Sequence, residues 1–351
     1  MNSRKELPDW LNQYIFGKLR AHYHCRRQDA EHNRDAGEEE VKEYMGTYFP
    51  RSYCEVCCIA ENLFGNEDYK SLLTDSVSSD RVINILDLGC GTGGDIVGLL
   101  SALCGQLPSV DINVRAFDAN ETALRYMSDV VNAFARESGH SIYVRPEKFE
   151  VNSESDFQSL AEGIGDSKFD YILCCKACGE LWSSHIVAEP YMAAAELFSE
   201  KLKDYGTMLI LDVASQPGGC PKYLPEEMNE ELNAFAASHG SFCTLVPRPC
   251  AEHPECSEKK CYMLKYFLVS HSGSYFLDGS NVCYRIICRK ELRDQMRMSQ
   301  QQREQVIGGH IAAAGQNQDK AYIIHDGNKR GRRACPWFKT GEEADAFDIN
   351  S

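Results

Sequence analysis

The chain has 351 residues, 43% of them hydrophobic, which is enough to build one large folded domain or two smaller ones and excludes disorder as the overall state. The formal net charge of -15 opposes a general electrostatic attraction to nucleic acid. No run approaches the roughly 18 apolar residues of a membrane span. The first residues resemble neither a signal peptide nor a transit peptide, so we predict a cytoplasmic protein that does not enter a membrane.

Residues 1–80 are predicted to form an N-terminal helical region. Apolar residues at helical spacing indicate one amphipathic helix from residue 7 to about 28 and a second from about 38 to 64, broken near Pro50. Three cysteines lie on the second helix. Their spacing is compatible with a metal, but buried helical cysteines are the favoured interpretation. These residues are Cys54, Cys57 and Cys58.

Residues 81–290 alternate between strands and helices, which is typical of a doubly wound α/β sheet. Strands are predicted near residues 82–88, 112–118, 142–149, 169–175, 206–213, 241–247 and 282–288. Helices are predicted near 94–104, 120–138, 154–163, 184–203 and 225–239. Residues 291–351 are predicted to form a polar helix followed by a loop-rich tail. One basic group in this tail is a candidate nucleic-acid face: Lys329, Arg330, Arg332, Arg333 and Lys339.

A glycine-rich turn joins the first predicted strand of this domain to its helix, in the sequence Asp87-Leu88-Gly89-Cys90-Gly91-Thr92-Gly93-Gly94-Asp95. Glycine at such a turn permits backbone angles closed to other residues and lets a ligand approach the main chain. We expect the turn to leave bare backbone amides for a ligand. A second acid, Asp118, ends the next strand, where a carboxylate can accept hydrogen bonds from a ribose diol.

This arrangement resembles the cofactor site of class I methyltransferases that use S-adenosylmethionine. The resemblance implies a Rossmann-like seven-stranded sheet, with Gly89, Gly91 and Gly93 beside the methionine and ribose and Asp118 on the ribose hydroxyls. A nicotinamide enzyme, or an α/β domain with an empty turn, is the alternative. The full set of predicted cofactor-binding residues is Asp87, Gly89, Gly91, Gly93, Asp118, Asn152 and Cys175.

The third and fourth strands end in further polar residues. Asn152 follows the third strand, where class I enzymes commonly place polar groups beside the adenine, although it could equally cap a helix. The fourth strand runs into Cys178 and Glu180, at the strand end that faces the ligand crevice of an open parallel sheet. We predict Glu180 as the catalytic residue that orients or deprotonates the methyl acceptor. Cys178 is interpreted as a packed thiol, because no activating base is evident near it.

A cysteine-rich insert is predicted at residues 243–263. Cys250, His253, Cys256 and Cys261 stand among prolines and charges, which makes metal ligation a better interpretation than core packing. The four side chains suit one tetrahedral zinc site. Alternatively, the three cysteines hold a [4Fe-4S] cluster and a distant cysteine supplies the fourth ligand. Cys335 is the first choice for this ligand, and Cys283 is the second, because its strand pattern explains it as a core residue.

The order of these features resembles the methyltransferase-like proteins of the small ribosomal subunit. The resemblance rests on residues 44–53, the glycine turn, residues 179–181 and the cysteine cluster, and it covers roughly residues 40–290. It implies a [4Fe-4S] cluster and a ribosomal RNA substrate. The sequence departs from the family in the short spacing from Cys256 to Cys261, the position of His253 and the poor match around Cys335. It also has Asp212-Val213-Ala214-Ser215 at the end of the predicted strand 206–213, where the family usually has a glutamate and a proline.

The sequence therefore predicts an S-adenosylmethionine-dependent methyltransferase acting on RNA, with a metal-bearing insert. One alternative is a catalytically silent ribosome-assembly or RNA-binding factor, and another is a small-molecule or protein methyltransferase. The expected partner is RNA or the small ribosomal subunit. The sequence leaves the oligomeric state and the methyl acceptor open.

Overall fold

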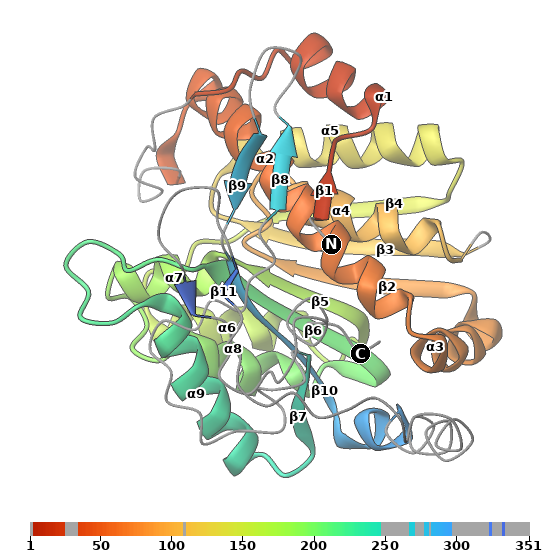
Figure 1. The fold of residues 1–351 in the computed structure, drawn as a ribbon, viewed down its shortest axis with the longest axis vertical. Helices are drawn as coiled ribbons and strands as arrows, with labels where there is room; N and C mark the ends of the chain where they lie inside the picture. Colours follow the sequence, from red (N-terminus) through yellow and green to blue (C-terminus); the bar gives the residue numbers. More distant parts are fainter. Residues whose placement is uncertain are drawn as a thin grey trace.

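The structure is a computed structural model that describes residues 3–24, 34–107, 110–246, 267–270, 277–280, 282–296, 323–324 and 332–333. Its centre is a seven-stranded sheet with the order β4-β3-β2-β5-β6-β10-β7 (Figure 1). The strands are β2 (Val82–Leu88), β3 (Asp111–Asp118), β4 (Ile142–Lys148), β5 (Phe169–Cys175), β6 (Leu202–Val213), β7 (Phe242–Val246) and β10 (Val282–Arg289).

All neighbouring strands of this sheet are parallel except β10, which runs antiparallel to both β6 and β7. Counted along the chain, the order is 3-2-1-4-5-7-6, which is the class I methyltransferase fold. The predicted fold class is confirmed, and the seven strands lie where the apolar runs placed them.

Two layers of helices cover the sheet. α4 (Gly94–Cys104) and α5 (Glu121–Ser138) share one apolar core with the N-terminal helices, and α6 (Glu154–Ile164) to α9 (Leu224–Ser238) share the other. Alternate residues of one strand point into opposite layers: Tyr171 and Leu173 of β5 belong to the first core, and Ile172 and Cys174 to the second. This alternation is the period-two pattern of a strand buried on both faces.

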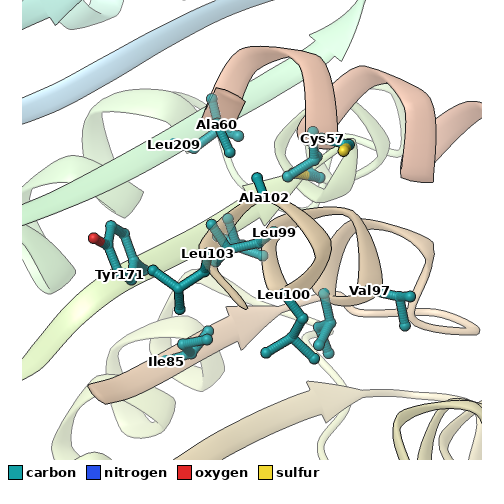
Figure 2. Close-up of a cluster of buried hydrophobic side chains, with 14 of the residues drawn as sticks. Cys57, Ala60, Ile85, Val97, Leu99, Leu100, Ala102, Leu103, Tyr171 and Leu209 are labelled. Carbon is teal, nitrogen blue, oxygen red and sulfur yellow. The ribbon is translucent and has the colours of Figure 1, made fainter. Parts of the chain in front are cut away.

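The N-terminal region packs directly on the first layer. It contains α1 (Asp9–Asn12), a π-helix (Gln13–Lys18), α2 (Glu38–Phe64) and α3 (Glu67–Asp80). Figure 2 shows Cys57 and Ala60 of α2 above Leu99 and Leu103 of α4, with Ile85 of β2 beyond them. Cys54, Cys57 and Cys58 are buried in this core, as predicted.

Several helix boundaries differ from the prediction. α2 is continuous through Pro50, so the predicted break is wrong. Pro50 and its neighbour Phe49 are buried, and burial of this stretch against α4 offsets the backbone hydrogen bond that proline removes. The first helix was predicted to extend to residue 28 but ends at Lys18. Residues 25–28 of the predicted helix lie outside the described residues.

Of the predicted helix 184–203, only Pro190–Ser199 is helical, as α8. A short helix that was not predicted, α7 (Ala177–Ser183), precedes it. Pro190 occupies the first turn of α8, a position that suits proline because its missing N–H would have no helical partner there. Residues 290–296 are helical, which agrees with the start of the predicted polar helix.

Two smaller sheets complete the described chain. β1 (Ser3–Lys5), β8 (Phe267–Ser270) and β9 (Leu277–Ser280) form one, and β11 (Ile323–Ile324) pairs with β12 (Arg332–Arg333). β8 also contacts α2. No helix of the described residues is long and apolar enough to cross a membrane.

Close packing of α2 on α4 depends on glycine. A Cβ atom at Gly98 would lie 2.6 Å from the Tyr53 carbonyl oxygen, whereas one at Gly163 in α6 would meet nothing within 4 Å. Alanine in a helix interior is normally about 1 kcal/mol more favourable than glycine. We expect Gly98→Ala to lower the free energy of unfolding by about 1–3 kcal/mol through overpacking. Gly163→Ala should raise it slightly. Urea denaturation of both variants measures this, and equal effects would contradict the packing described.

Candidate active site

A cleft of about 1030 Å³, counting the volume open to solvent, lies at the carboxyl ends of β2, β3 and β5. Gly89 and Gly91 line it on one side, and Asp118 lines it from the end of β3. Open parallel sheets bind ligands at this position, which is the switch point where the strand order reverses between β2 and β5.

The wall of the cleft beyond Asp118 is apolar. It consists of Phe149, Val151, Phe157 and Leu160, from the end of β4 and from α6. Phe149 also stands edge-on to Phe117 of β3, with their ring centroids 6.4 Å apart. Such a wall can hold a flat aromatic ligand group by burying its faces.

The glycine turn adopts the backbone angles that the sequence predicted. The φ angles of Gly89, Gly91 and Gly93 are +79°, +50° and +84°, in the left-handed region that favours glycine. A Cβ at Gly93 would lie 2.6 Å from Met127 Cγ, so this glycine permits helix packing and does not line the cleft. Gly89 and Gly91 do line it.

Four backbone amides of the turn already have partners, so the expectation of bare amides is wrong for Gly89, Cys90, Gly91 and Gly93. The amides of Gly89 and Cys90 both donate to the Phe117 carbonyl, at 2.9 and 3.0 Å. The Gly93 amide donates to the Cys90 carbonyl at 2.8 Å. The Gly91 amide donates to Asp118 Oδ2 at 2.7 Å. β3 therefore holds the turn, and these four amides are not free to bind a ligand.

Asp118 has a structural role alongside the predicted one. Its Oδ1 accepts from the Asn120 amide at 2.8 Å, while Oδ2 accepts from Gly91. Burial raises the pKa of Asp118, and these hydrogen bonds act in the opposite direction. Each carboxylate oxygen can accept a second hydrogen bond, so the side chain can still bind a diol.

Asp87 lies beneath the turn and does not line the cleft. It is fully buried, and neither carboxylate oxygen accepts a hydrogen bond from the described residues. Burial, and next the nearby carboxylate of Asp95, raise its pKa well above the usual value. A buried carboxyl group without a partner is costly and is typical of functional sites.

Glu180 lines the cleft from the first turn of α7. Solvent reaches its side chain through the open cleft, while protein surrounds it on the other sides. This partly desolvated position, together with the carboxylates of Asp118 and Asp212, raises the pKa of Glu180 to about 8, and Arg34 and Lys176 act against the shift. At neutral pH in the ligand-free cleft, Glu180 is therefore mostly protonated.

Asp212, at the end of β6, fixes the start of α7. It accepts hydrogen bonds from the Gly179 amide at 2.7 Å and from the Tyr191 hydroxyl at 3.1 Å. A Cβ at Gly179 would lie 2.5 Å from Asp212 Oδ2, so only glycine fits here. The residue before Glu180 thereby sets where Glu180 enters the cleft.

Lys176 joins the cleft to the N-terminal helix. Its ammonium donates to Glu55 Oε2 at 2.6 Å and to Ser52 Oγ at 3.0 Å, and both acceptors lie on α2. Glu55 is fully buried. Burial alone would lower the pKa of Lys176, but the Glu55 carboxylate more than offsets this and the pKa is raised. Lys176 also has a φ of +70°, an uncommon conformation for a residue with a side chain.

The remaining predicted residues are placed as follows. Cys175 lines the cleft, and burial raises the pKa of its thiol well above the usual value. Asn152 lies outside the lining residues and accepts a hydrogen bond from Arg34 at 3.2 Å. Ser153, rather than Asn152, caps α6 with its side chain. Cys178 is buried, with its Sγ 3.4 Å from that of Cys174.

The predicted metal ligands lie outside the described residues: Cys250, His253, Cys256, Cys261 and Cys335. Within the described ranges, no group of three or more His, Cys, Asp or Glu side chains is placed to hold a metal ion. The flanking strands do show where the insert is attached. β7 and β6 run in the same direction, so Val246 and Val282, which flank residues 247–281, lie toward the cleft edge of the sheet.

The sequence missed the contributions of the N-terminal region to the cleft. Tyr44 and Val41 of α2 line it, and so does Arg34, which precedes α2. The Lys176–Glu55 pair was also missed. A glutamate amid the buried cysteines of α2 was the available signal, since a buried carboxylate requires a cation.

No protein-family model and no curated protein matches the chain. Solved structures similar to it include the plantazolicin methyltransferase BpumL in complex with SAH, with 12% identity over 79% of this chain and 93% of that one and a TM-score of 0.39. A putative class I S-adenosylmethionine-dependent methyltransferase from Listeria monocytogenes has 11% identity over 79% of both chains and a TM-score of 0.32. Both TM-scores are below 0.5, so the fold assignment rests on strand order and direction.

The Lys176–Glu55 pair generates a stability prediction. Lys176→Met should lower the free energy of unfolding by about 3 kcal/mol, because it leaves a buried carboxylate without its ammonium. The double variant Lys176→Met, Glu55→Gln should recover part of this loss, since no charge then remains. Urea denaturation of the single and double variants measures the coupling. Losses that simply add would contradict a direct interaction.

Proposed function

We propose that the protein is an S-adenosylmethionine-dependent methyltransferase. The observation that carries this proposal is the carboxylate of Asp118 at the glycine turn, in a cleft at the carboxyl edge of a sheet with the 3-2-1-4-5-7-6 order. The acid offers acceptors for ribose hydroxyls, and the apolar wall behind it suits a base.

The residues present fit this cofactor. Gly91 has a conformation that favours glycine, and a Cβ there would project toward the hydroxyl of Tyr44. Phe149, Val151 and Phe157 would hold the adenine, and Asp118 the ribose. The bound cofactor supplies a methyl group on an already activated sulfonium.

The chain's own residues then have to position the acceptor and take up a proton. Holding two reacting groups in line supplies much of the rate of such a transfer. Glu180 faces the cleft and can accept the acceptor's proton when it is ionised, which in the ligand-free protein requires a pH near 8 or above. A positive charge bound nearby lowers that pKa and extends the active range toward neutral pH.

Isothermal titration with S-adenosylhomocysteine tests the cofactor assignment. We expect the wild type to bind, and Asp118→Asn to bind roughly tenfold more weakly or worse, because a hydrogen bond to a charged acceptor is lost. Asp111→Asn, at the other end of the same strand, is the matched control and should bind like the wild type. The assignment fails if the wild type does not bind, or if Asp118→Asn and Asp111→Asn behave alike.

For the substrate we propose RNA, with a metal-bearing insert that supports the substrate side. The sequence resemblance to the small-subunit methyltransferase-like proteins supports this, together with the attachment of the insert toward the cleft edge of the sheet. Cys250, Cys256, Cys261 and Cys335 would hold a [4Fe-4S] cluster, or His253 would join the first three in a zinc site. The net charge of -15 favours instead a protein or small-molecule acceptor.

One preparation separates these possibilities. Anaerobically purified protein is analysed for iron and zinc and then incubated with labelled S-adenosylmethionine and fractionated cell extract. We expect label in RNA, and iron that is lost in Cys250→Ser. Label in protein or small molecules would replace RNA as the substrate class. Co-sedimentation with small ribosomal subunits without any transfer would indicate an assembly factor, and stoichiometric zinc would replace the cluster.

A further inference from the structure

Tyr44 places a hydroxyl group in the cleft beside the glycine turn. It lies on α2, and its ring packs on that of Tyr48 one turn later, with centroids 4.9 Å apart. A Cβ built on Gly91 would be 3.5 Å from the Tyr44 hydroxyl oxygen. This hydroxyl makes no hydrogen bond to the described residues, although the ring itself is mostly covered.

Acids surround this hydroxyl. Burial first, and then the charges of Glu180, Asp118 and Asp95, raise the pKa of Tyr44 well above its usual value. The phenol therefore remains neutral at neutral pH, and its proton remains available for donation. A neutral donor among carboxylates can bind a ligand oxygen that these acids would otherwise repel.

Several other donors beside the turn already have partners. The amides of Gly89, Cys90, Gly91 and Gly93 donate within the chain. The Lys176 ammonium is bound to Glu55 and Ser52. The Arg34 guanidinium donates to Asn152 and lies 3.6 Å from Glu150. Tyr44 therefore offers a ligand oxygen beside Gly91 a neutral hydroxyl that has no partner among the described residues.

We propose that Tyr44 is a cofactor-contact residue, whose hydroxyl donates a hydrogen bond to an oxygen of the ligand bound beside Gly91. This rests on the proposed function, because the ligand is S-adenosylmethionine or its product. The oxygen belongs either to the carboxylate of the amino-acid end or to the ribose. In both cases the N-terminal helix completes the cofactor site, and the sheet domain alone lacks this donor.

Tyr44→Phe tests the proposal, because it removes the hydroxyl and keeps the ring that packs on Tyr48. Tyr48→Phe is the matched control, on the same helix but outside the lining residues. Binding of S-adenosylhomocysteine is measured by isothermal titration, together with the melting temperature of the ligand-free proteins. We expect Tyr44→Phe to weaken binding by about 3- to 10-fold, the effect of one neutral hydrogen bond, with an unchanged melting temperature. Tyr48→Phe should bind like the wild type.

A second ligand identifies the oxygen. 5′-Methylthioadenosine lacks the amino-acid end, so a loss seen only with S-adenosylhomocysteine assigns the carboxylate, and an equal loss with both assigns the ribose. Binding by Tyr44→Phe that equals wild type, or an equal loss in Tyr48→Phe, overturns the proposal. A wild type that binds neither ligand removes the proposed function itself, a result distinct from normal binding by both wild type and Tyr44→Phe.

Discussion

The Lys176 ammonium is the interaction on which the cleft depends. It lies between the end of β5 and α2, where it is bound to the fully buried Glu55. Its charge also acts on Asp95, Asp212 and Glu180, three acids from three different elements. Desolvating several carboxyl groups together is unfavourable, and a single cation placed among them offsets part of that cost. The left-handed conformation of Lys176 is a strain that this position maintains.

The glycines of the turn show how one motif meets two kinds of constraint. Gly91 lies at the cleft, beside the Tyr44 hydroxyl. Gly93 and Gly94 are required elsewhere, since a Cβ on either would collide with Met127 or with the Phe49 carbonyl. Some glycines of the motif are therefore required because α5 and α2 pack closely against the start of α4, and others because a ligand binds at the turn. A sequence pattern alone does not separate these two causes, because both demand the same residue.

The fold was predictable because strand and helix periodicity are local. The apolar runs that became β2, β5 and β10 needed no knowledge of their neighbours. The start of α8 was predicted six residues too early, because Pro190 was read as an interior residue of the helix, although proline is favoured at a helix start. At the site, Asp118 was predictable from its position after a strand. The ion pair to Glu55 was not, since 121 residues separate its partners.

Contacts between residues far apart in the chain also explain why the N-terminal region was not predicted to be part of the cofactor site. Arg34, Val41 and Tyr44 reach the cleft only because the chain around them is fixed to α5. The Asn120 side chain donates to the Ala36 carbonyl at 3.1 Å, and Glu38 accepts hydrogen bonds from Arg125 and Tyr126. Asn120 also caps α5 and donates its amide to Asp118. Asn120 therefore connects the acid at the glycine turn to the segment that leads into α2, so the N-terminal helix and the cleft form one unit, built on a shared core.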